Sequence, residues 1–278
     1  MSRKANLLSA QSEANRISSA FQAFPIDPFQ IAEENEITVL SGDSGKPGIS
    51  GCIVFANDGA CIYFSKTIQN VGFQRFTIAH ELGHYFIPGH PDEIIGAGGT
   101  HFSQADFGGV SPIEREADQF AAHLLMPTNL SKELLLTAPR GLGGITYLAE
   151  TAITSVTSSA IRAVQIDPYP LAVIKSKNNS IQFSILTPSL RSFGFMRAHA
   201  KGCNLPDVQD PEESYLGDWF DTAPPGLAVR AETIILGAYG LLTVITPKSA
   251  VSDPYEDENE DDEAALEASW TPRFKGQR

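Results

Sequence analysis

One short stretch, Phe76–His84, constrains this chain more than any other part of the sequence. If the stretch is helical, His80 and His84 are four residues apart, so their imidazoles lie one turn apart on the same face. Both rings can then reach a single metal ion, and Glu81 lies beside them to accept or donate a proton. The stretch therefore predicts a helix that carries two metal-binding imidazoles and a neighbouring carboxylate.

The flanks of this stretch predict that the helix is buried. Apolar residues lie on more than one of its sides, and Gly83 leaves room for another backbone to come close. Pro88 and Gly89 then end the helix. The pattern His-Glu-x-x-His is that of zinc metallopeptidases, but it also arises by chance, and two helical histidines can lie on a surface or in a core without any metal. The metal hypothesis therefore needs a third ligand.

A second helix, predicted from Ser111 to Met126, supplies candidates for that ligand. Ser111 is expected to cap it, and Pro112 suits its first position. Glu114 and Asp118 are four residues apart on one face. Glu114 can complete a His₂Glu zinc site, and Asp118 can accept a hydrogen bond from the outer nitrogen of a ligand histidine. The alternative for Glu114 is an acid that only favours the positive end of the helix dipole.

Two other polar residues of this helix are expected to lie on ordinary helix surface. Glu116 points roughly 200° away from Glu114 by helix geometry, which makes it a weaker ligand candidate. His123 lies toward the same side as Glu116 and is interpreted in the same way.

The two blocks together resemble the ImmA/IrrE family of zinc metallopeptidases. The resemblance rests on Phe76–His84, on the run from Glu114 to Pro127, and on their order and spacing, and it extends over residues 5 to 165. It implies that His80, His84 and Glu114 bind one zinc ion, that Glu81 is the catalytic base, and that Asp118 hydrogen-bonds a ligand histidine. Members of the family often carry Asn at the position of Asp118.

The predicted fold class is α+β, in four parts. These are a zincin-like metallopeptidase domain (1–127), a helix-turn-helix-like module (128–166), a small C-terminal α+β domain (167–250) and an acidic, disordered tail (251–278). Turn residues between apolar runs predict hairpins in the first and third parts. The segments with these signals are a strand at 36–40, a hairpin at 51–64, a strand pair at 171–186 with its turn at 178–179, and a hairpin at 227–246.

Residues 90–110 are rich in glycine and are predicted to form a loop. His90 and His101 lie in this loop, and no function is assigned to either. The residue that would stabilise a developing oxyanion stays open among four candidates: Tyr85, His90, His101 and His123.

Composition limits the partners. The net charge is −13, and residues 253–263 hold eight acids and no base. This acidity, with few basic residues in the helical module, argues against direct nucleic-acid binding and favours a structural or protein-binding module. No stretch approaches the ~20 apolar residues that span a bilayer, and the three cysteines form no Cys-x-x-Cys pair. A cytoplasmic protein is expected, and no oligomeric state is predicted.

The prediction is therefore a zinc-dependent endopeptidase that makes a limited cut in a protein substrate. The family resemblance implies that this substrate is a helix-turn-helix transcriptional repressor, whose cleavage derepresses stress or mobile-element genes. One alternative is a non-catalytic, antitoxin-like regulatory protein with a structural zinc. Another is a general peptidase that degrades small peptides.

Overall fold

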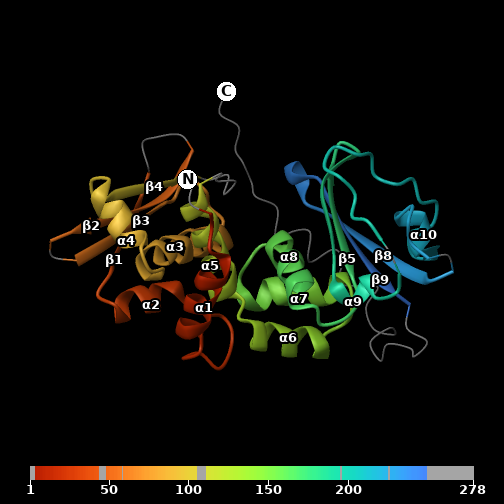
Figure 1. Ribbon diagram of the computed structural model, residues 1–278, viewed down its shortest axis with the longest axis horizontal. Coiled ribbons are helices and arrows are strands. Elements are labelled where there is room, and N and C mark those ends of the chain that lie inside the picture. The colour runs from red at the N-terminus through yellow and green to blue at the C-terminus, as the bar shows by residue number, and fades with distance from the viewer. Residues whose placement is uncertain are drawn as a thin grey trace. The chain divides into compact units, whose positions relative to one another are not determined.

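The computed structural model describes residues 4–43, 48–57, 59–104, 111–194, 196–224 and 226–248 (Figure 1). Contacts divide the chain into two compact units. The first contains residues up to 130 together with 149–155, and the second contains 131–148 together with the residues from 156 onward. The chain is α+β, as predicted. The domain limits predicted from the sequence stay predictions, and the acidic run at 253–263 lies outside the described residues.

A mixed four-stranded sheet lies in the first unit. Its order is β1-β3-β2-β4, with β1 (Thr38–Gly42) parallel to β3 (Gly59–Ser65), and β2 (Ile49–Ala56) antiparallel to both β3 and β4 (Thr100–Gln104). The β2–β3 pairing is the hairpin predicted from the sequence. β4 is an edge strand, since it pairs with β2 on one side and ends the sheet order.

Helix α3 (Val71–Phe86) packs against β2 and β3 and against helix α5 (Pro112–Leu125). Asn70 begins α3 by accepting a hydrogen bond from the backbone N–H of Phe73 at 2.9 Å. Ser111 precedes α5 as predicted, but its side chain makes no capping hydrogen bond. Helix α1 (Leu7–Ser18) packs on α5, and α2 (Pro28–Glu34) packs on α3.

Glycines permit two close approaches to α3. A Cβ on Gly83 would lie 3.2 Å from the Cα of Ala117, so this glycine lets α3 and α5 approach closely, as predicted. A Cβ on Gly51 of β2 would lie 2.5 Å from Cγ2 of Thr77 and 2.8 Å from Oε1 of Glu81. The contact between the sheet and α3 therefore requires glycine at position 51.

The prediction of a loop over residues 90–110 is wrong for its first part. Helix α4 (His90–Gly96) and strand β4 occupy residues 90–96 and 100–104, while residues 105–110 are not described. Gly98 and Gly99 have positive φ angles, +114° and +77°, and form the turn that leads into β4. The glycines that suggested a loop instead make a tight reversal between two short elements, which the sequence pattern alone does not distinguish.

The second unit contains a five-stranded antiparallel sheet in the order β6-β5-β9-β8-β7. The predicted strand pairs are present here: β5–β6, turning at Asn178 and Asn179 with positive φ, and β8–β9. Trp219 and Phe220 are buried in the core beside the sheet. The strands are β5 (Ala172–Lys177), β6 (Ser180–Leu186), β7 (Ser214–Tyr215), β8 (Ala228–Ile235) and β9 (Leu241–Pro247).

The remaining elements lie between residues 128 and 239. Three helices follow α5 in the chain: α6 (Thr128–Thr137), α7 (Leu142–Ala152) and α8 (Val156–Ile166), with a break between α7 and α8. The others are short: α9 (Pro188–Arg191), α10 (Leu216–Trp219) and the 3₁₀ turn Gly237–Tyr239. None of the helices in the described ranges is long and apolar enough to cross a membrane.

Replacing Gly51 by Ala should destabilise the first unit, because the added methyl group collides with Thr77 and Glu81. We expect a loss of about 1–3 kcal/mol in the free energy of unfolding, measured by urea denaturation of metal-free protein. The matched control is Gly96→Ala, since a Cβ at this helical position meets nothing within 4 Å. Equal stability of the two variants would contradict the close sheet–helix contact.

Candidate metal centre

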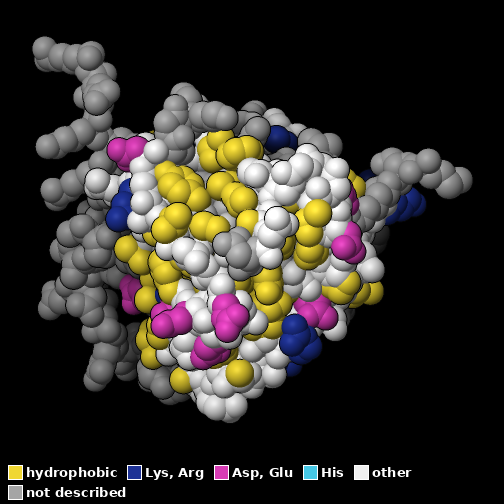
Figure 2. All heavy atoms as spheres, turned by 90° about the vertical axis from the view of Figure 1, so that its left-hand side faces the viewer, with side chains coloured by type: hydrophobic (Ala, Val, Ile, Leu, Met, Phe, Trp, Pro, Cys, Tyr) yellow, Lys and Arg dark blue, Asp and Glu magenta, His cyan; other side chains and the backbone are white. Residues whose placement is uncertain are grey.

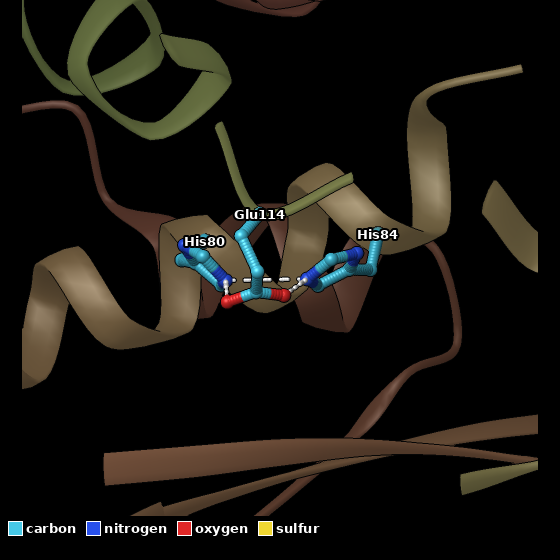
Figure 3. Close-up of side chains that lie close together, drawn as sticks. All are labelled: His80, His84 and Glu114. Atoms are coloured by element: carbon cyan, nitrogen blue, oxygen red, sulfur yellow. Dashed lines mark hydrogen bonds and ion pairs between the residues drawn. The ribbon is translucent and has the colours of Figure 1, made fainter. Parts of the chain in front are cut away.

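Helix α3 carries two histidines whose side chains are fully buried. The Nε2 atoms of His80 and His84 lie 3.2 Å apart, one helical turn from each other. The third member of the cluster, Glu114, comes from the first turn of α5. Its Oε2 lies 3.5 Å from Nε2 of His80, and its Oε1 lies 3.3 Å from Nε2 of His84 (Figure 3). These three residues form a group whose ligand atoms could hold one metal ion.

The distances within this group fit zinc. Zinc bound tetrahedrally by nitrogen and oxygen at ~2.0–2.1 Å requires its ligand atoms to lie about 3.3 Å from one another. The two imidazole nitrogens, 3.2 Å apart, are close to that value. Each oxygen of Glu114 lies at a similar distance from one of the two histidines, Oε1 at 3.3 Å from His84 and Oε2 at 3.5 Å from His80. Two imidazoles and one carboxylate also make the donor set of a catalytic zinc site, which keeps its fourth position open.

Asp118 lies one turn after Glu114 and contacts the outer nitrogen of His80. Its Oδ1 is 2.9 Å from Nδ1 of His80. Burial lowers the pKa of His80, but the contacts with Asp118 and Glu114 outweigh it and raise that pKa to about 10. The contact with Asp118 thus holds the ring of His80 by its outer nitrogen and leaves Nε2 facing His84 and Glu114.

The outer nitrogen of His84 has a different partner. Nδ1 of His84 lies 3.2 Å from Nδ1 of His90, and Nε2 of His90 lies 2.6 Å from Oε2 of Glu116. Burial lowers the pKa of His84 to about 3, so this ring is held neutral. For Glu114, burial raises the pKa, but contacts with three histidines outweigh it and hold the pKa far below the usual range.

Two expectations about α5 are wrong. Glu116 is fully buried and His123 is only 2% exposed, so neither lies on ordinary helix surface. The reason is that the opposite face of α5 also packs, against α1. Glu116 lies on the buried stripe that includes Ile113 and Phe120, and this spacing was the sequence signal that could have revealed it.

His101 also reaches the cluster, from strand β4. It pairs in register with Ile53 of β2, a buried core residue, so its side chain points toward the same face of the sheet. Its Nε2 lies 2.5 Å from Oε1 of Glu114, and its ring centroid lies 4.4 Å from that of His84. The sequence analysis assigned no function to His101, because β4 was not predicted.

Glu81 is fully buried next to the histidines. Neither of its carboxylate oxygens has a hydrogen-bond partner among the described residues, although the Ser103 hydroxyl is near enough to lower its pKa. Burial is the larger effect and raises the pKa of Glu81 to about 7. A buried carboxylate with no hydrogen-bond partner in the described part of the chain is costly, which makes Glu81 a candidate for a functional role.

One comparison with known proteins, the match to a family model, bears on this site. No functionally curated protein matched the chain. Among solved structures, a Mycobacterium tuberculosis transcriptional regulator is similar, with 15% identity and a TM-score of 0.49, over 85% of this chain and 75% of that chain. The family model of the IrrE N-terminal-like domain, Peptidase_M78, matches residues 32–150, which include all of α3 and α5. Residues 32–150 therefore belong to the ImmA/IrrE metallopeptidase family.

Proposed function

We propose that this protein is a zinc-dependent endopeptidase that makes a limited cut in a protein substrate. One observation carries the proposal: two buried imidazoles and a carboxylate converge with zinc-like spacing, beside a second buried carboxylate that has no partner in the described part of the chain. Membership of a metallopeptidase family implies the same type of activity.

In this proposal His80, His84 and Glu114 hold the zinc. Bound zinc supplies a Lewis acid that makes water nucleophilic near neutral pH and polarises the peptide carbonyl. Glu81 accepts the proton of the attacking water and delivers it to the departing amine. Its burial excludes bulk water from this transfer, and neither oxygen has a hydrogen-bond partner among the residues that the structure describes, so both are available. Asp118 orients the ring of His80.

His101 is the best candidate for contact with the developing oxyanion. His90 and His123 are buried and engage Glu116 and Gln119, while the ring of Tyr85 stacks on another aromatic ring. His101 reaches Glu114, and its side chain keeps 24% of its surface exposed. It therefore adjoins the proposed metal and is also accessible to a substrate.

The edge of β4 is the natural place for the substrate chain. A peptide in extended conformation can add to an edge strand through backbone hydrogen bonds, and β4 carries His101. Such a site selects an extended segment and so favours cutting of an exposed loop or linker. By resemblance to its family, we propose a helix-turn-helix transcriptional repressor as the substrate.

A non-catalytic regulator with a structural zinc is the rival function. Structural zinc sites are closed by four protein ligands, whereas only three residues of the described chain form the group here. Figure 2 also shows one face of the molecule, on which Lys and Arg side chains are few and separated and acidic side chains gather. That face shows no cluster of Lys and Arg side chains for nucleic-acid phosphates, so it would suit a protein partner better than a nucleic acid.

Zinc content tests the ligands. Wild-type protein purified without chelators should carry about one zinc per chain. Glu114→Ala should carry much less, because two imidazoles alone bind the ion weakly. The measurement is mass spectrometry of the metal after dialysis. Glu133→Ala, which removes an exposed glutamate, is the control and should keep its zinc. Full zinc in Glu114→Ala would exclude this ligand set.

The base is tested by Glu81→Gln. This variant should keep its zinc but lose cleavage by about 10²–10⁴-fold, because an amide cannot accept the proton. Cleavage is followed by mass spectrometry of new chain ends, using purified helix-turn-helix repressors and a library of unfolded peptides. Glu133→Gln is the control with an unchanged rate. Full activity of Glu81→Gln would rule out the mechanism, and cleavage of many unrelated peptides would favour a general peptidase.

Replacing His101 by Ala should lower kcat by about 10²-fold when zinc is saturating, because a donor to the oxyanion is lost. KM should change less, since β4 still binds the peptide backbone. Steady-state kinetics on the substrate that is cleaved fastest measure kcat and KM separately. A variant with unchanged kcat would show that His101 does not contact the reacting carbonyl.

A further inference from the structure

We propose that His90 and Glu116 are positioning residues, which hold His84 in the one tautomer that can bind the metal. The inference rests on the proposed function, because it assumes that His84 is a ligand. It assigns a role to two residues that neither the motif nor the three-residue group includes.

The four groups involved form a continuous chain of contacts from the metal site to the start of α1. Nδ1 of His84 contacts Nδ1 of His90 at 3.2 Å, and Nε2 of His90 contacts Oε2 of Glu116 at 2.6 Å. The other oxygen of Glu116 accepts a hydrogen bond from the backbone N–H of Asn6. The side chains of His84, His90 and Glu116 are all fully buried. Residues of four helices or their caps thus meet in one network.

In the proposed network Glu116 is ionised and His90 is neutral, and these two states fix the direction of each hydrogen bond. An ionised Glu116 can only accept, so Nε2 of His90 must carry a hydrogen and donate it. In neutral His90 the other nitrogen, Nδ1, then has no hydrogen and accepts. Nδ1 of His84 must therefore be the donor, which leaves the lone pair on Nε2 of His84. That Nε2 is the atom that faces His80 and Glu114.

A satisfied core histidine paired with a core carboxylate would also explain part of this arrangement. It would not explain why Nδ1 of His90 lies 3.2 Å from Nδ1 of His84, the outer nitrogen of a proposed ligand. Asp118 serves the other ligand directly, so the outer nitrogens of both proposed ligands are held. Fixing the tautomer of a ligand histidine in this way raises metal affinity.

The test is the zinc affinity of the full chain, measured by competition with a chromophoric chelator. His90→Phe keeps the ring volume but removes the acceptor for His84, and should weaken zinc binding by about 10- to 100-fold. His90→Asn should recover part of that affinity, because its side-chain oxygen lies near the former Nδ1 position and can accept from His84. A purely packing role would favour Phe over Asn instead.

The variant Glu116→Gln tests the direction of the hydrogen bonds in this network. The N–H of Asn6 needs an acceptor, which turns the amide NH₂ of Gln toward Nε2 of His90. His90 must then carry its hydrogen on Nδ1, and His84 must move its own hydrogen to Nε2, where it opposes metal binding. Long-range ¹H–¹⁵N spectra of the imidazoles should show hydrogens on Nδ1 of His84 and Nε2 of His90 in zinc-loaded wild type, and the reverse for His90 in the variant.

Ile94→Ala is the matched control for lost stability, because Ile94 is buried in the same helix as His90. It should bind zinc as wild type does. Wild-type affinity in His90→Phe, or the opposite tautomers in wild type, would overturn the positioning role while leaving the proposed function intact. Equal losses in Ile94→Ala and His90→Phe would overturn it as well. A wild type that binds no zinc would overturn both proposals.

Discussion

The contact between α3 and α5 is the interaction on which the rest of this structure depends. His80 and His84 come from one helix and Glu114 from the other, so the metal group exists only while the two helices stay close together. Gly83 makes that closeness possible, because a larger side chain would meet the backbone of Ala117. The apolar core around the two helices then fixes the spacing of three polar groups that would not assemble by themselves.

Burial explains the electrostatics of the site. Burial lowers the pKa of both histidines: hydrogen bonds with Asp118 and Glu114 outweigh this effect at His80 and raise its pKa, whereas burial prevails at His84. Such groups are retained in a core when each has a partner, and here almost every one does. Glu81 differs, since neither of its oxygens has a partner among the described residues. The carboxylate without such a partner is also the one proposed to move a proton.

Much of the site could be predicted from the sequence, because residues that are four positions apart in a helix lie on the same face of it. His80 with His84, and Glu114 with Asp118, were expected on common faces, and the structure brings these residues together. The hairpins were found through their turn residues, such as Asn178 and Asn179. The resemblance to a metallopeptidase family added the expected roles of these residues as metal ligands and as a hydrogen-bond acceptor.

The wrong predictions have a common physical cause: short elements are buried by contacts with distant parts of the chain. His101 reaches the site because β4 adds to the edge of the sheet, and five residues after a glycine turn carry too weak a pattern to predict a strand. Glu116 was expected at the surface because it points away from Glu114. Helix α5 also packs against α1, and His90 of α4 pairs with Glu116. Contacts between elements far apart in the chain decided these positions.

The most direct test of the central claim is the X-ray absorption spectrum of the zinc-loaded protein at the zinc edge. The account predicts nitrogen and oxygen neighbours at ~2.0–2.1 Å, with the multiple-scattering pattern of two imidazoles and no sulfur. A zinc–sulfur distance of about 2.3 Å, or scattering from fewer than two imidazoles, would mean that the metal binds elsewhere. In that case His80, His84 and Glu114 would not form the metal centre of this protein.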